Sequence, residues 1–219
     1  MDFPRKVLVC IYTCKKDEDS LNKLLDSDWF KSISSISNFK FIKVYADESI
    51  DKDFILDEDS LILKTEEDYL NLSVKTFLMI KHCYENFEFD FLLKIDSSII
   101  EDNHFSVSPV FSFENFKNKF KESFFSKPYN GYAKIEGNSL ESFKNWASLK
   151  SVFVLPEPLF EEIGFDKWPN SYWSGKSYSI SRELIPLVLE SESLFYKFKN
   201  LMGGCEDFCI GMILRDHMV

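Results

Sequence analysis

The sequence predicts an α/β fold in which a mostly parallel central sheet is flanked by helices. Two apolar runs, at residues 6–12 (KVLVCIY) and 89–95 (FDFLLKI), are typical of parallel strands buried on both faces. Helical and strand patterns alternate between them, which indicates an open parallel sheet. The length of 219 residues suits one domain covering 1–219, either complete or a piece of a longer chain.

The elements of the first half follow from local patterns. A helix is expected over residues 20–36, where leucines and Trp29 recur at helical spacing. Residues 39–45 (FKFIKVY) alternate as a second strand, and residues 60–63 form a short third one. The clearest helix covers 68–86, because Leu72, Ile80 and Tyr84 fall on one face of it.

The second half is less regular. Short apolar runs predict strands at 152–155 and 178–180, and a helix is expected over 181–189 with Ser181 as its N-cap. Pro186 predicts that this helix is kinked or begins later. The Phe- and Lys-rich stretch 111–125 fits no clear period, and buried core is the favoured interpretation over an exposed aromatic surface.

Composition excludes several classes of protein. The net charge is −10, from 26 basic and 36 acidic side chains, and no basic stripe is present, so no nucleic-acid partner is expected. There is no apolar run of about 18 residues, and the N-terminal segment has the pattern of a buried strand rather than of a signal peptide. The five cysteines form no CxxC pair, which favours reduced thiols in the cytoplasm.

Chemistry is expected where strands end, because ligands of open α/β sheets bind beyond the carboxyl ends of the strands. Thr13 follows the first strand, Asp96 and Ser98 follow the strand at 89–95, and Glu206-Asp207 precede an apolar helix. Asp96 fits either a turn cap or a ligand of a divalent cation. Glu206-Asp207 fit either helix-capping carboxylates or a general base.

Four segments share motifs with one known family. They are residues 68–76 (DYLNLSVKT), 91–100 (FLLKIDSSII), 168–181 (WPNSYWSGKSYSIS) and 205–211 (CEDFCIG). In this order they resemble D-x-Y-x-N-L-T-x-K-T, F-V-L-K-T-D-D-D-V-F, Y-P-x-Y-x-S-G-x-G-Y-V-x-S and x-E-D-V-Y-x-G. These motifs belong to the β-1,3-galactosyltransferase-like glycosyltransferases (family 31), which include the Fringe enzymes.

The resemblance implies a GT-A (Rossmann-like) fold and inverting transfer of a galactose- or N-acetylglucosamine-type hexose from a UDP-sugar to a hydroxyl of a glycan or other acceptor. Asp207 would be the general base, with Glu206 the next candidate. Trp173, Ser174 and Gly175 would line the acceptor pocket. The residues implied on the donor side are Thr13, Asp68, Lys75, Lys94, Asp96 and Ser98.

The resemblance also implies a Mn²⁺ or Mg²⁺ ion, with Asp96, Ser98 and His217 as candidate ligands. The sequence departs from the family here, because Asp96-Ser97-Ser98 lacks the second carboxylate of the D-x-D motif. Two alternatives therefore stay open: a metal-independent transferase, and a non-catalytic carbohydrate- or partner-binding module. Asp68 and Lys75 also have a structural interpretation, as a helix cap and a solvated lysine.

Overall fold

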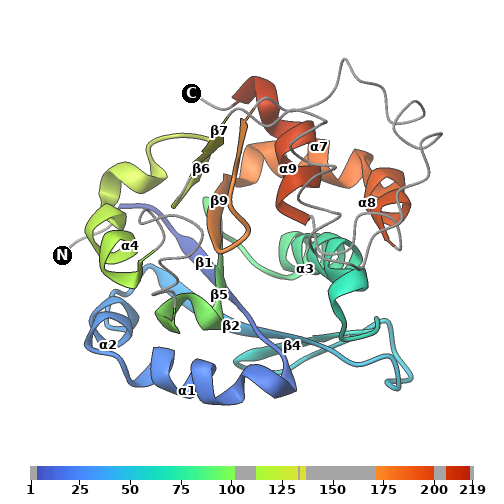
Figure 1. Cartoon of the computed structure of the whole chain (residues 1–219), viewed down its shortest axis with the longest axis horizontal. Helices are drawn as coiled ribbons and strands as arrows, with labels where there is room; N and C mark the ends of the chain where they lie inside the picture. Colours follow the sequence, from blue (N-terminus) through green and yellow to red (C-terminus); the bar gives the residue numbers. More distant parts are fainter. Residues whose placement is uncertain (1–3, 102–111, 133, 137–170, 200–205, 218–219) are drawn as a thin grey trace.

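The computed structural model describes residues 4–101, 112–132, 134–136, 171–199 and 206–217 (Figure 1). Within these residues a seven-stranded sheet has the order β3-β4-β2-β1-β5-β9-β6. β1 (Val7–Tyr12) pairs in parallel with β2 (Phe39–Ala46) and β5 (Phe91–Asp96), and β2 with β4 (Ser60–Leu63). β3 (Phe54–Leu56) and β9 (Ser177–Ser181) are antiparallel to their neighbours, so the sheet is mostly parallel, as predicted.

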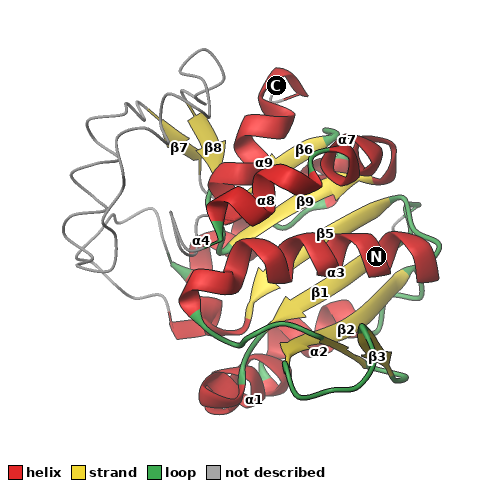
Figure 2. Ribbon diagram, turned by 90° about the vertical axis from the view of Figure 1, so that its right-hand side faces the viewer, coloured by secondary structure: helices red, strands yellow, loops and turns green. Residues whose placement is uncertain are grey.

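Helices cover both faces of this sheet (Figure 2). Alternate residues of β1 enter two different apolar clusters, one on each side. On one side lie α1 (Glu18–Asp26), α2 (Asp28–Ser34) and α4 (Phe113–Lys119). On the other lie α3 (Leu72–Asn86), α7 (Ile185–Glu190), α8 (Glu192–Phe198) and α9 (Glu206–Leu214). The unbroken burial of β1 is the reason for its continuous apolar sequence.

The first three predicted strands are confirmed, but the single helix over 20–36 is wrong. The backbone of Ser27 is extended, which ends α1 and begins α2. The Ser27 hydroxyl accepts a hydrogen bond from the Phe30 N–H at 3.2 Å, so it caps the second helix. β3 is absent from the sequence prediction because its three residues are all half-buried, which leaves no alternation to detect.

The long helix expected over 68–86 is present with a different first turn. A 3-10 turn, η2 (Tyr69–Asn71), precedes α3. The Asp68 carboxylate accepts a hydrogen bond from the Asn71 N–H at 2.8 Å, so Asp68 caps this turn. β5 follows the helix and ends at Asp96, and η3 (Ser97–Glu101) continues from it.

The aromatic stretch belongs to the core. In α4 and η4 (Glu122–Phe125), Phe116, Phe124 and Phe125 are buried, and the Phe116 ring meets Trp29 edge-on at a centroid distance of 5.2 Å. The interpretation of 111–125 as core is therefore confirmed where the structure describes it. The described residues contain no helix that is long and apolar enough to cross a membrane.

β6 (Tyr129–Gly131) closes one edge of the main sheet, and β7 (Lys134–Glu136) pairs with β8 (Ser171–Trp173) in a small second sheet. The strand predicted at 178–180 is β9, and the one at 152–155 lies outside the described residues. A 3-10 turn, η6 (Arg182–Leu184), follows β9, and α7 begins later with Pro186 in its first turn. Ser181 precedes η6 but its side chain makes no capping hydrogen bond.

Candidate active site

A pocket of about 260 Å³ opens at the carboxyl ends of β1 and β5. These strands are adjacent and parallel in the sheet, with Tyr12 opposite Asp96. The residues that follow the two strands therefore lie side by side at the carboxyl end of the sheet. Ligands of open α/β sheets bind at this end of the strands. The pocket is lined by Tyr12, Thr13, Cys14, Lys16, Asp17, Glu67, Asp68, Tyr69, Leu72, Lys75, Lys94, Asp96, Ser97, Ser98 and Glu206.

Lys94 joins the two acidic segments of the predicted site. Its ammonium lies 2.7 Å from Asp96 Oδ1 and 3.0 Å from Glu206 Oε1, and it also donates to the Gly175 carbonyl. An ammonium has three hydrogens, so these three acceptors use all of them. Burial by itself would lower the pKa of Lys94, but the charges of Asp96 and Glu206 outweigh it and raise that pKa.

A second buried lysine also lies close to the Tyr12 ring. The Lys75 and Lys94 ammonium groups lie 4.4 and 4.6 Å from the ring centroid. Lys75 is 1% exposed and bonds to Glu67 Oε1 at 2.6 Å and to the Thr13 carbonyl at 2.7 Å. The interpretation of Lys75 as a solvated side chain is therefore wrong. Burial lowers the pKa of Lys75, and the charge of Glu67 opposes that effect.

The two adjacent acids at the start of α9 have different surroundings. Glu206 is buried, pairs with Lys94 and lines the pocket. Asp207 is half-buried and accepts hydrogen bonds from the N–H groups of Gly175 and Phe208, both at 2.8 Å. Burial, followed by the charge of Glu206, raises the pKa of Asp207 to about 7, although both N–H groups and Lys94 oppose the rise. A carboxylate with such a pKa is suited to take up a proton near neutral pH.

The loop between β8 and β9 packs directly on these acids. A Cβ atom at Gly175 would lie 2.6 Å from Glu206 Oε1 and 3.3 Å from Asp207 Oδ2, so only glycine fits there without a shift. Ser174 is buried beside it, and Trp173 packs against Gly131 at the start of the loop. Gly175 is therefore in contact with the acid pair, and Trp173 and Ser174 directly precede it in sequence, but none of the three lines the pocket itself.

The expected metal ligands do not come together as a cation site. Asp96 is paired with Lys94, and the Ser98 hydroxyl accepts a hydrogen bond from Lys176 Nζ at 2.9 Å. His217 lies in η7 (Arg215–His217), beyond α9, whose rise from Glu206 to Leu214 is about 12 Å. In the described part of the chain no three His, Cys, Asp or Glu side chains are grouped to hold a metal. Among the described residues, Asp96 and Ser98 are therefore each engaged by a lysine of the chain.

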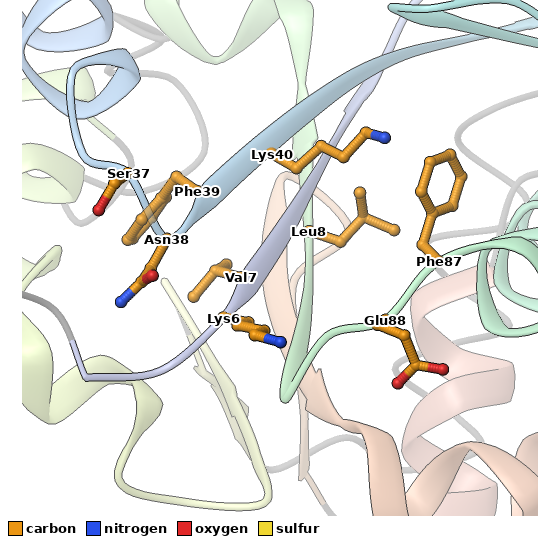
Figure 3. A pocket seen from close by; sticks show the side chains of 9 residues that line it. All are labelled: Lys6, Val7, Leu8, Ser37, Asn38, Phe39, Lys40, Phe87 and Glu88. Atoms are coloured by element: carbon orange, nitrogen blue, oxygen red, sulfur yellow. The ribbon is translucent and has the colours of Figure 1, made fainter.

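A second pocket, of about 180 Å³, lies at the opposite end of the strands; Figure 3 shows the residues that line it. It is formed at the amino ends of β1 and β2, where the Lys40 ammonium lies 4.4 Å from the centroid of the Phe87 ring. Ligands of α/β sheets bind beyond the carboxyl ends, and both acid segments lie there. We therefore place the candidate active site at the first pocket.

The contacts that Tyr12, Glu67 and Lys176 make around this site were not expected from the sequence. Tyr12 is the last residue of an apolar strand, and nothing in the sequence around it predicts that its ring contacts two lysines. Glu67 lies eight residues before Lys75 and Lys176 lies 78 residues after Ser98, so no local spacing predicts either contact.

The family model described as galactosyltransferase matches residues 43–219. No curated protein matches the chain. The matched region includes β5, the β8–β9 loop and α9, the segments that bring Asp96, Gly175 and Glu206 around Lys94. The mostly parallel sheet with helices on both faces is that of a GT-A-like fold. Since the match covers most of its length, the chain belongs to the galactosyltransferase family of glycosyltransferases.

Proposed function

We propose that the protein transfers a hexose, of galactose or N-acetylglucosamine type, from a UDP-sugar to a hydroxyl of a glycan or other acceptor. The observation that carries this proposal is the convergence of Asp96, Glu206 and the Gly175 carbonyl on one buried ammonium, that of Lys94. In a galactosyltransferase-family chain this arrangement lies at the pocket where a sugar nucleotide would bind.

In the proposed reaction the acceptor hydroxyl gives its proton to Asp207 as its oxygen attacks the anomeric carbon of the donor. A new carbon–oxygen bond forms on one face of the sugar. The bond to the diphosphate breaks on the other face, and its electron pair leaves with UDP, so the configuration inverts. The raised pKa of Asp207 supports its assignment as the base. Glu206 is assigned as a positioning residue, because it is already engaged by Lys94.

On the donor side we assign Thr13, Asp68, Ser98 and Asp96 to the walls of the nucleotide pocket. All four line it, together with Lys75 and Lys94. Both lysines are held by carboxylates, so their role is to fix the shape of the pocket rather than to bind phosphate as mobile cations. Trp173, Ser174 and Gly175 are assigned to the acceptor side because Gly175 contacts Asp207.

Calorimetric titration with UDP, followed by UDP-galactose and UDP-N-acetylglucosamine, tests the donor assignment. We expect UDP to bind, and one of the two sugar nucleotides to be hydrolysed slowly or transferred to an added saccharide. Hydrolysis should speed up as the pH rises through about 7, because Asp207 must lose its proton to act as base. If UDP binds neither with Mn²⁺ nor without it, the proposal is rejected.

A non-catalytic carbohydrate-binding module is the second candidate. The observation that favours it is the engagement of both Asp96 and Ser98 by lysines of the chain itself. It predicts saccharide binding without turnover of any UDP-sugar. Saccharide-array binding combined with the donor assays above separates the two functions.

A further inference from the structure

The Asp68 carboxylate, which lines the pocket, is held through one of its two oxygens. Asp68 Oδ1 accepts hydrogen bonds from the Asn71 backbone N–H at 2.8 Å and from Asn71 Nδ2 at 2.7 Å. Asn71 is 1% exposed, and its amide also donates to Glu66 Oε2 at 2.8 Å, so both amide hydrogens are used and the side chain is fixed. Among the described residues no donor bonds to Asp68 Oδ2. The carboxylate therefore has a set orientation and one unused acceptor oxygen.

The other carboxylates of the pocket are engaged differently. Three of them, Glu67, Asp96 and Glu206, pair with buried lysines. Asp17 has the Cys14 thiol as its side-chain donor at 3.3 Å, and a thiol is a weak donor that orients a carboxylate poorly. Of the five carboxylates that line the pocket, Asp68 is therefore the one that combines a fixed orientation with no paired lysine.

The strand order separates Asp68 from the acids assigned to the reaction. Asp68 follows β4, whereas Asp96 ends β5, and these strands lie on opposite sides of β1 in the order β4-β2-β1-β5-β9. The proposed base, Asp207, bonds to Gly175 in the loop that leads into β9. A donor whose hexose lies beside Asp207 has its nucleoside at the other end of the diphosphate. The nucleoside is therefore the part of the donor that extends toward Asp68.

The chemistry of this wall of the pocket suits hydroxyl groups rather than phosphate. A carboxylate repels phosphate but accepts a strong hydrogen bond from a hydroxyl. Thr13 also lines the pocket, and its Oγ1 is buried without a hydrogen-bond partner among the described residues. An unpartnered buried polar atom calls for a ligand or a water molecule as its partner. Ribose offers two neighbouring hydroxyls, and an acidic side chain binds ribose in this way in other α/β nucleotide sites.

We propose that Asp68, oriented by Asn71, accepts a hydrogen bond from a ribose hydroxyl of the donor, so that the protein selects ribonucleotides over deoxyribonucleotides. The inference rests on the proposed UDP-sugar function and specifies which part of the donor this wall of the pocket recognises. Removal of the hydroxyl leaves the carboxylate oxygen without its donor inside the complex, and such a mismatch lowers affinity more than the loss of a contact at a water-filled surface.

The test is calorimetric titration of UDP, 2′-deoxy-UDP and 3′-deoxy-UDP, with the wild type and three variants. The wild type should bind UDP about tenfold or more tightly than at least one of the deoxy analogues. In Asp68→Ser this ratio should fall to within about twofold of one, because serine keeps a capping oxygen for Asn71 but lacks the second oxygen. The three ligands carry the same charge, so the ratio is insensitive to the charge that the substitution removes. Asp57→Ser, at an exposed turn between β3 and β4, is the matched control and should keep the wild-type ratio.

Asp68→Asn is the third variant and decides the question if Asp68→Ser fails to fold, because asparagine caps as well as aspartate and should also lose the preference for UDP. The inference is overturned if the wild type binds UDP and both deoxy analogues equally, or if the Asp68 variants keep the wild-type ratio. Titration of UDP-galactose identifies the other source of hydroxyls: variants that weaken UDP-galactose alone, with the ratio unchanged, would assign Asp68 to the hexose and overturn the inference. Wild type that binds neither UDP nor its analogues would reject the proposed function itself, and the inference with it.

Discussion

The backbone N–H of Gly175 donates to Asp207 Oδ2 at 2.8 Å. This bond joins the β8–β9 loop to the first turn of α9 across 32 residues of sequence. The Gly175 carbonyl meanwhile accepts from Lys94 on β5, so the same peptide segment connects three elements of the site. The position of the proposed base therefore depends on the conformation of the β8–β9 loop.

Gly175→Ala should disrupt this arrangement. The added methyl group would lie 2.6 Å from Glu206 Oε1, so the loop or the acid must move. Because displacement of about 1 Å costs about 100-fold in rate, we expect a loss of that order in transfer or donor hydrolysis. UDP affinity and turnover measured side by side check the prediction. Lys134→Ala on exposed β7 serves as control and should keep the wild-type rate.

Asp207→Asn should abolish transfer and spare UDP binding. The amide keeps an oxygen for the Gly175 N–H but cannot accept a proton, and loss of a general base costs about 100-fold or more. Turnover of the UDP-sugar and the dissociation constant of UDP are the two measurements. Asp216→Asn, an exposed acid in η7, is the matched control. Parallel losses of rate and affinity in Asp207→Asn would contradict its assignment as the base.

Asp207 should also make the fold less stable as the pH rises. Its pKa is raised from 3.8 to about 7, so between these values the folded chain holds a proton that the unfolded chain has released. The free energy of unfolding therefore falls with rising pH in this window. Urea unfolding of wild type and Asp207→Asn at pH 5 and pH 8 should show the wild type losing about 2 kcal/mol more. Equal losses would mean that Asp207 titrates normally.

Removing Lys75 should destabilise the protein more than removing an exposed lysine. Lys75→Met leaves the Glu67 carboxylate without its ammonium, and breaking a buried ion pair from one side costs about 3 kcal/mol. Glu67→Gln in the same chain removes the unpaired charge and should recover part of the loss. Denaturant unfolding of the two single variants and the double variant measures this coupling. Additive effects would show that the pair contributes no interaction energy.

The layout of the sheet could be predicted from sequence because burial on both faces requires a continuous apolar strand. β1 and β5 satisfy this requirement, and Asp96 and Glu206 line one pocket beyond the carboxyl ends of these strands. Ser27, which divides the first helical region, was missed because serine is compatible with both a helix and a cap. The edge strand β3 was missed because all its residues are half-buried.

The sequence by itself indicated the family, the mostly parallel sheet and the two acidic segments that contain Asp96 and Glu206. Each of these depends on a local pattern or motif. Only the tertiary structure decided which charges meet. Lys94 and Glu206 are 112 residues apart, and Ser98 and Lys176 are 78 apart. A lysine is ordinarily solvated, and it is buried only where acceptors converge from other elements. That convergence is a property of the packed sheet, loop and helix, so no single stretch of sequence contains it.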